Sequence, residues 1–223
     1  MVGGPDISQL CEKLSVKTSF VNGLRVTSKE ILDITQMALL GQTNATLVQS
    51  FNLNNIPAVG LSGHDINLLI AEFVDQESLG YVGKIVKVNG DFLKLLLANK
   101  ILPVIAPLVI DGNGNTFNVN ADMVAAAIAI SIKAKRLILL SDIDGYYANF
   151  PDKDSLVKFL SKSEVQAILD RPEKVIEGMK PKLTSCLEAT SNGVISAHII
   201  NGKVAQGLIK VIEFPNSIGT TIE

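Results

Sequence analysis

The stretch that decides the fold is residues 115–145, NTFNVNADMVAAAIAISIKAKRLILLSDIDG. A short extended run over residues 116–119 leads to Asn120-Ala121-Asp122, which opens a small apolar helix. A continuous apolar strand follows over residues 137–140 and stops at the polar segment 141–145. This order predicts a βαβ unit, and ligands of open α/β sheets bind beyond the carboxyl ends of the strands. The polar residues at the helix entry and at the strand exit are therefore candidate ligand contacts.

Composition bounds the class of protein. The chain has 223 residues, 47% of them hydrophobic, with no Trp and a formal net charge of −2. We expect an α/β core built from aliphatic side chains, and no nucleic-acid partner, because there is no basic surplus to neutralise phosphates. No apolar run reaches membrane-spanning length, so we expect no membrane partner and a cytoplasmic location. Cys11 and Cys186 are predicted to be buried free thiols.

Capping signals predict several helix boundaries. We expect a capping box at residues 27–30 before a helix over 31–40, and a second box at residues 161–164 before a helix over 165–169. Asp91 is predicted to cap a helix over 92–99, and Gly193 to end a helix over 183–190 in the left-handed conformation. His198 lies inside an apolar strand and is predicted to be structural.

Three positions allow both a structural and a functional interpretation. The Gly3-Gly4 pair before the first helix could present amides to an anion, but a plain turn with Asp6 as the helix cap explains it equally well. Arg25 follows an Asn-Gly turn and could hold a carboxylate in a forked pair, although most arginines are solvated at the surface. Asp122 at a helix entry suggests a cap.

Several kinds of site are disfavoured by missing patterns. There is no phosphate-binding Gly-x-x-x-x-Gly-Lys-Ser/Thr loop and no dinucleotide-binding Gly-x-Gly-x-x-Gly loop. His64 and His198 are too isolated for a metal cluster or a catalytic triad, and Ser62 and Ser141 lack a nucleophile elbow. What remains is a set of small polar strand exits with isolated cations, which suits phosphoryl transfer.

Six motifs in register carry a resemblance to a known family. Residues 118–122 (NVNAD), 139–145 (LLSDIDG) and 178–182 (GMKPK) resemble the amino-acid kinase family, and residues 20–27, 59–63 and 79–83 are similar to its N-acetyl-L-glutamate branch. The resemblance implies a three-layer αβα sandwich with a mainly parallel, open central sheet. It also implies a single kinase domain over residues 1–223, in which about 1–120 binds the acyl amino acid and about 121–223 binds the nucleotide.

The resemblance implies a reaction and a set of site residues. The reaction is transfer of the γ-phosphate of ATP to the side-chain carboxylate of N-acetyl-L-glutamate, the second step of arginine biosynthesis. Mg²⁺ would be carried on the phosphates without a protein metal site, and the chain would form a homodimer or a larger homo-oligomer. The implied roles are catalytic for Lys182 and Asp122, substrate-binding for Gly3, Gly4, Arg25 and Asn118, and nucleotide-binding for Ser141, Asp142, Gly145 and Met179.

The chain departs from the family pattern at its start. Met1-Val2 stands where the family has the His-Gly of its second glycine loop, so the first strand and the first Lys-x-Gly-Gly loop are absent. We expect either a sequence that starts downstream of its true beginning, or an impaired remnant that only binds a ligand or partner. His64 stands where a lysine is usual. Glutamate, aspartate, carbamate or UMP as acceptor is a lesser alternative, against which residues 22–27 argue.

Overall fold

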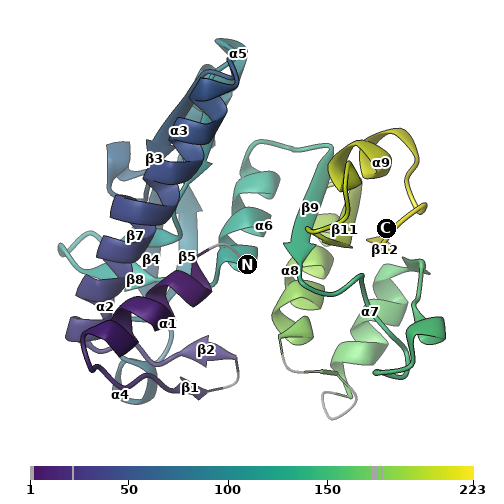
Figure 1. Ribbon diagram of the computed structural model, residues 1–223, viewed down its shortest axis with the longest axis horizontal. Coiled ribbons are helices and arrows are strands. Elements are labelled where there is room, and N and C mark those ends of the chain that lie inside the picture. The colour runs from purple at the N-terminus through teal and green to yellow at the C-terminus, as the bar shows by residue number, and fades with distance from the viewer. Residues whose placement is uncertain (1–2, 22, 172–174, 177) are drawn as a thin grey trace. The chain divides into compact units, whose positions relative to one another are not determined.

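The chain divides into two compact units. The structure is a computed structural model that describes residues 3–21, 23–171, 175–176 and 178–223, so Met1, Val2 and Asn22 of the predicted motifs lie outside it. One unit is Val2–Val124 and the other is Ala125–Glu223, and the division falls within helix α6 (Ala121–Ser131) (Figure 1). Across these described ranges no helix has both the length and the apolarity needed to cross a membrane.

The first unit is built on short strands with helices packed against them (Figure 1). One sheet has the order β5-β4-β7-β8, β3 pairs with β6 in parallel, and β1 and β2 form an antiparallel hairpin. Within the sheet, β4 and β7 are parallel, and the outer pairs β4/β5 and β7/β8 are antiparallel. The elements in chain order are α1 (Gly4–Lys13), β1 (Phe20–Val21), β2 (Leu24–Arg25), α2 (Lys29–Gln36), η1 (Met37–Asn44), α3 (Ala45–Leu53), β3 (Ala58–Leu61), η2 (Asp65–Asn67), β4 (Leu69–Phe73), α4 (Gln76–Leu79), β5 (Gly83–Val88), α5 (Gly90–Ala98), β6 (Leu102–Ile105), β7 (Leu108–Ile110) and β8 (Thr116–Asn118).

A long helix organises the core of this unit. The predicted helices over 31–40 and from Asn44 are one continuous run, because α2 passes through the wider π-helical segment η1 into α3. Buried Asn44 lies at the end of η1, and its side-chain amide donates to the Val104 carbonyl oxygen at 2.8 Å. That bond fastens the helix to β6. The apolar core beside it consists of Ile7, Cys11, Leu32, Ile34, Ala38, Leu39, Ala106 and Leu108.

The second unit has a four-stranded sheet with helices on both faces. The strand order is β10-β12-β11-β9, with β9 and β11 parallel and β12 antiparallel to β11. Leu139 and Ile199 belong to the apolar core shared with α6 and α8, and α9 packs on β11, where Gly207 lies beside Ile200 (Figure 1). The elements are β9 (Arg136–Ser141), η3 (Lys153–Ser155), β10 (Phe159–Leu160), α7 (Lys162–Leu169), α8 (Met179–Ser191), β11 (Ser196–Asn201), α9 (Gly207–Glu213) and β12 (Thr220–Ile222). The α/β class with open sheets that contain parallel strand pairs is confirmed.

Two predicted helix caps are wrong. Helix α2 is capped by Ser28, whose hydroxyl accepts from the Ile31 amide at 3.2 Å, because the Thr27 hydroxyl is used elsewhere. Helix α5 is capped by Asn89, so Asp91 lies inside the first turn, where a carboxylate is favourable near the helix N-terminus.

Two other predicted boundaries are confirmed. Ser161 and Glu164 form the reciprocal capping box of α7. Gly193 follows α8 with a φ of 99°, the left-handed conformation that glycine adopts without penalty. Both cysteines, Cys11 and Cys186, are buried free thiols as predicted.

Candidate functional site

Arg25 is buried, although a surface arginine was the commoner expectation. Arg25 ends strand β2 of the β1–β2 hairpin, and only 8% of the surface of the residue is exposed. Its Nη2 donates to the Gly4 carbonyl oxygen at 3.3 Å and to Ser8 Oγ at 2.9 Å, and the guanidinium stacks 4.6 Å from the Phe20 ring centroid. Its Nη1 has no hydrogen-bond partner among the described residues. Burial lowers the pKa of Arg25, yet an arginine stays protonated in proteins, so a buried cation with an open donor remains.

The glycine pair lies at the start of α1 beside this cation. Gly3 has a φ of 98°, and a Cβ added to it would overlap the Leu39 side chain, so only glycine fits. The alternative in which Asp6 caps the helix is wrong, because the Asp6 carboxylate accepts from Thr43 Oγ1 at 2.7 Å. Among the described residues no side chain caps α1. Pro5 has no amide, but the amides of Gly4 and Asp6 lie in the first turn, where unpaired amides can bind an anion.

Asn118 joins Arg25 through Thr27, which was predicted as a helix cap and not as a site residue. The Asn118 side-chain amide donates to Thr27 Oγ1 at 3.2 Å, although the two residues lie 91 apart in the chain. The Thr27 hydroxyl in turn donates to the Arg25 carbonyl oxygen at 2.8 Å. The signal available was the spacing of Arg25 and Thr27, since residues two apart in an extended segment share a face.

Asp122 does not cap α6. The Asn120 side-chain oxygen accepts from the Asp122 amide at 2.9 Å and from the Met123 amide at 3.4 Å, so Asn120 satisfies the helix end. Asp122 is buried, with 8% of its surface exposed. The capping interpretation of its carboxylate is therefore wrong, and a role near the substrate stays a prediction.

In the second unit three of the predicted nucleotide residues, Ser141, Asp142 and Gly145, lie at the exit of β9, beside the exit of the parallel strand β11. Ser141 ends β9 opposite Asn201, which ends β11, and the Ser141 hydroxyl donates to Asp142 at 3.3 Å. Asn201 donates to one oxygen of Asp144 at 2.9 Å, and the Tyr147 hydroxyl donates to the other at 2.8 Å. These two hydrogen bonds lower the pKa of Asp144, so its carboxylate stays ionised.

Sequence reasoning missed the Asp144–Asn201 pair. Its signal was a polar residue directly after each of two apolar strands, because parallel strands end at the same edge of a sheet.

Gly145 packs where no side chain fits. A Cβ there would lie 2.5 Å from Thr220 Oγ1, and that same oxygen accepts from the Tyr146 amide at 2.8 Å. The segment after β9 is therefore held closely against β12.

Helix α8 carries the last two predicted residues. It begins after Gly178, which has a φ of 84°, and no side chain of the described residues caps its N-terminus. Lys182 lies in the first turn and is only 6% exposed. Met179 is 1% exposed and belongs to the apolar core, so its side chain packs inside the unit, which leaves only its backbone to contact a nucleotide.

The two histidines are tied to hydroxyl groups. His64 contacts Ser62 Oγ through Nδ1 at 3.1 Å and Thr116 Oγ1 through Nε2 at 3.0 Å. His198 is fully buried between Ser196 and Thr221, and its predicted structural role is confirmed. In the part of the chain that the structure describes, no three His, Cys, Asp or Glu side chains form a group that could hold a metal ion.

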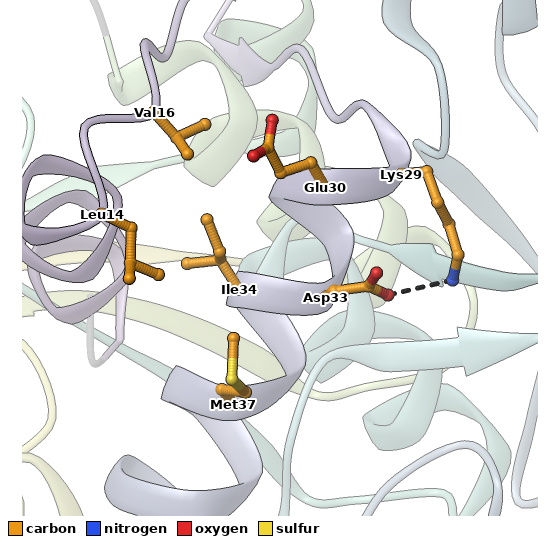
Figure 2. Close-up of a pocket in the computed structure, with 7 residues that line it drawn as sticks. All are labelled: Leu14, Val16, Lys29, Glu30, Asp33, Ile34 and Met37. Atoms are coloured by element: carbon orange, nitrogen blue, oxygen red, sulfur yellow. Dashed lines mark hydrogen bonds and ion pairs between the residues drawn. The ribbon is translucent and has the colours of Figure 1, made fainter.

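An open pocket of about 630 Å³ lies on the first unit, away from these residues (Figure 2). None of the predicted site residues lines it, and its Lys29–Asp33 ion pair at 2.9 Å is exposed. Figure 2 shows apolar side chains from the end of α1 and from α2 facing one another across it. The lining residues are Leu14, Val16, Lys29, Glu30, Asp33, Ile34 and Met37. We therefore place the candidate site at the Arg25 cluster and at the strand exits.

Comparisons with known proteins identify the family of the chain. The model of the amino acid kinase family matches residues 1–201. An acetylglutamate kinase from Petrotoga mobilis is 41% identical over 99% of this chain and 74% of that protein. The solved structure of smu.665 from Streptococcus mutans UA159 has a TM-score of 0.85 at 27% identity, covering 99% of this chain and 82% of that one. The solved structure of N-acetylglutamate synthase from Neisseria gonorrhoeae, complexed with coenzyme A and N-acetyl-glutamate, has a TM-score of 0.82 at 27% identity. The match covers 97% of this chain and 49% of that one. The chain belongs to the amino acid kinase family.

Proposed function

We propose that the chain transfers the γ-phosphoryl group of ATP to the side-chain carboxylate of N-acetyl-L-glutamate, a step of arginine biosynthesis. The observation that carries this proposal is the buried Arg25 guanidinium, whose Nη1 lacks a hydrogen-bond partner within the described residues. A buried donor of this kind costs free energy until a ligand pairs with it, and a carboxylate oxygen forms a charge-assisted hydrogen bond with such a donor. The likeness to an acetylglutamate kinase over 99% of the chain supports the choice of ligand.

Each unit is proposed to bind one reactant. In Val2–Val124, Arg25 and Asn118 hold the acyl amino acid, and the amides at Gly3 and Gly4 stabilise negative charge near its side chain. In Ala125–Glu223, Ser141, Asp142 and Gly145 hold ATP together with the backbone at the start of α8.

The chemistry requires positive groups and no general base. A side-chain carboxylate has a pKa of about 4.3 and is already ionised at neutral pH. The barrier comes from bringing two anions together, so cations and oriented amides near the transferred group accelerate the reaction. We assign that role to Lys182 and to the α1 amides, and we assign Asp122 to hold the cationic groups in place. Mg²⁺ bound to the phosphates would neutralise part of their charge, and we propose that ATP itself carries it.

A chain that only binds its ligand is the alternative, and it is not favoured. Both proposed catalytic side chains, Asp122 and Lys182, are present, and each is buried in its own unit. The homodimer or larger assembly and the cytoplasmic location expected from the sequence stay predictions.

The test is an acyl-phosphate trap. The purified chain is incubated with ATP, Mg²⁺ and N-acetyl-L-glutamate, and hydroxylamine converts the product to a coloured hydroxamate. We expect a product with N-acetyl-L-glutamate and only background with L-glutamate or L-aspartate. A rate for either unacylated acid that equals the rate for N-acetyl-L-glutamate would contradict the proposed substrate, and no product from any acid would contradict the activity.

Arg25→Lys tests the residue that carries the proposal. Lysine keeps the charge but does not place a donor where Nη1 lies, so the KM for N-acetyl-L-glutamate should rise about 10- to 100-fold, which corresponds to one charged hydrogen bond. The KM for ATP should stay unchanged. Arg136→Lys, at the start of β9, is the matched control and should leave both constants unchanged. Equal KM values for wild type and Arg25→Lys would remove Arg25 from the site.

A further inference from the structure

We propose that Thr27 is a positioning residue that fixes which way the side-chain amide of Asn118 faces the acyl amino acid. This inference rests on the proposed function, because it concerns how the same ligand is recognised.

The direction of two hydrogen bonds carries the argument. Thr27 is fully buried, and its hydroxyl lies 2.8 Å from the Arg25 carbonyl oxygen, which can only accept. The single hydroxyl proton of Thr27 therefore forms the hydrogen bond to the Arg25 carbonyl oxygen. Thr27 Oγ1 must then accept from Asn118, so the NH₂ group of that amide, at 3.2 Å, faces Thr27. If the Asn118 side-chain oxygen faced Thr27 Oγ1 instead, two hydrogen-bond acceptors would face each other. The flipped orientation of the Asn118 side chain is therefore excluded.

The backbone around Thr27 prevents the hydroxyl from moving away. The Thr27 amide donates to the Leu79 carbonyl oxygen at 2.9 Å, and its carbonyl accepts from the Tyr81 amide at 2.8 Å. Gly80 between them has a φ of 69°, and a Cβ there would overlap the Thr27 carbonyl. The Tyr81 carbonyl oxygen in turn accepts from the backbone N–H of Asn118 at 2.9 Å. Residues 79–81 thus hold Thr27 and Asn118 in one fixed relation.

The consequence is a defined polarity on the open side of Asn118. With NH₂ facing Thr27, the amide oxygen is presented as an acceptor, together with one remaining N–H donor. An acylated amino acid offers an amide N–H that can donate to this oxygen, while its carboxylate is held by Arg25. Thr27 thereby links the two groups that recognise the ligand without needing to touch it.

The experiment removes the hydroxyl and keeps the shape. Thr27→Val should raise the KM for N-acetyl-L-glutamate about tenfold, the size expected for one lost hydrogen bond, and leave the KM for ATP unchanged. Thr27→Ser keeps the hydroxyl and should stay within about twofold of wild type in the same assay. Thr35→Val is the matched control, because buried Thr35 also donates its hydroxyl to a backbone carbonyl, that of Ile31 at 2.7 Å. That variant should lose similar stability with no change in KM.

A double-mutant cycle separates positioning from general structure. In an Asn118→Ala background, Thr27→Val should raise the KM no further, because no amide remains to orient. Thr27→Ala replaces Thr27→Val if the latter fails to fold. Binding of N-acetyl-L-glutamate is measured in parallel by calorimetry, so the inference can be judged without turnover.

The outcomes distinguish this inference from the proposed function. A wild type that neither phosphorylates nor binds N-acetyl-L-glutamate overturns both. An active wild type with equal KM values for Thr27→Val and Thr27→Ser, or a full effect of Thr27→Val in the Asn118→Ala background, overturns only the role of Thr27.

Discussion

His198 should make the second unit lose stability between pH 7 and pH 5. The imidazole is fully buried between two hydroxyl groups, and burial, together with the charge of Arg136, lowers its pKa from 6.5 to about 4. In the unfolded chain the ring protonates near its ordinary value. The unfolded state therefore binds more protons across this pH window, so stability falls as the pH falls.

The magnitude follows from the two pKa values. The full shift is worth about 3 kcal/mol of unfolding free energy at 1.36 kcal/mol per pKa unit. About 2 kcal/mol of it is lost between pH 7 and pH 5, and the rest between pH 5 and pH 4. Asp75, Asp111, Asp144 and Glu164 also have lowered pKa values, but their hydrogen bonds are lost only as the pH falls toward 4 and below.

The assay is urea unfolding of wild type and His198→Gln at pH 7, 6 and 5, followed by circular dichroism. Glutamine cannot titrate, so the unfolding free energy of His198→Gln should be lower than that of wild type at pH 7. It should then change by less than about 0.5 kcal/mol between pH 7 and pH 5. The wild type should lose about 2 kcal/mol over the same range. Parallel pH profiles for the two proteins would refute the reasoning, because the slope would then come from other groups.

Two further predictions concern the site. Lys182→Met should lower kcat by about 10³-fold, because a cation about 4 Å from the transferred charge contributes on the order of 4 kcal/mol at an effective dielectric near 20. The control is Lys180→Met, at an exposed position in the same turn of α8, and equal losses of activity in the hydroxamate assay would contradict a specific role of Lys182. Gly80→Ala should lower the unfolding free energy by more than about 2 kcal/mol. Gly114 has a φ of 88° and nothing within 4 Å of an added Cβ, so Gly114→Ala should cost only about 1 kcal/mol. Urea unfolding measures both variants, and equal costs would mean that the Thr27 carbonyl does not obstruct a side chain at position 80.

The fold class was predictable because its signals are long. The apolar run of β9 and the small apolar helix α6 need no tertiary context to be recognised. Helix caps were less predictable, since several polar residues compete within a few positions. Thr27 and Ser28 are equally good caps in isolation, and the partner that Thr27 finds at Arg25 decides between them. The short strand β4 was missed because five residues carry little periodicity.

The sequence predicted candidate site residues but not the surroundings of each side chain. The resemblance pointed to Arg25, Asn118 and Met179 alike. Only packing separates them, because Met179 is enclosed by the apolar core and Arg25 keeps an open donor. Thr27 was predicted only as a helix cap within a family-like motif, and its proposed role follows from a contact across 91 residues of sequence.

The surroundings of Arg25 show why this cation suits ligand binding better than stability. The partners that the described residues supply, the Gly4 carbonyl, the Ser8 hydroxyl and the Phe20 ring, are all neutral. They orient the guanidinium and offset part of its desolvation without cancelling its charge. A carboxylate partner within the protein would have stabilised the fold and closed the site. The described residues leave the charge of Arg25 uncompensated and its Nη1 without an acceptor. An anionic ligand can therefore form both an ion pair with the guanidinium and a hydrogen bond with Nη1, and neither interaction exists before the ligand binds.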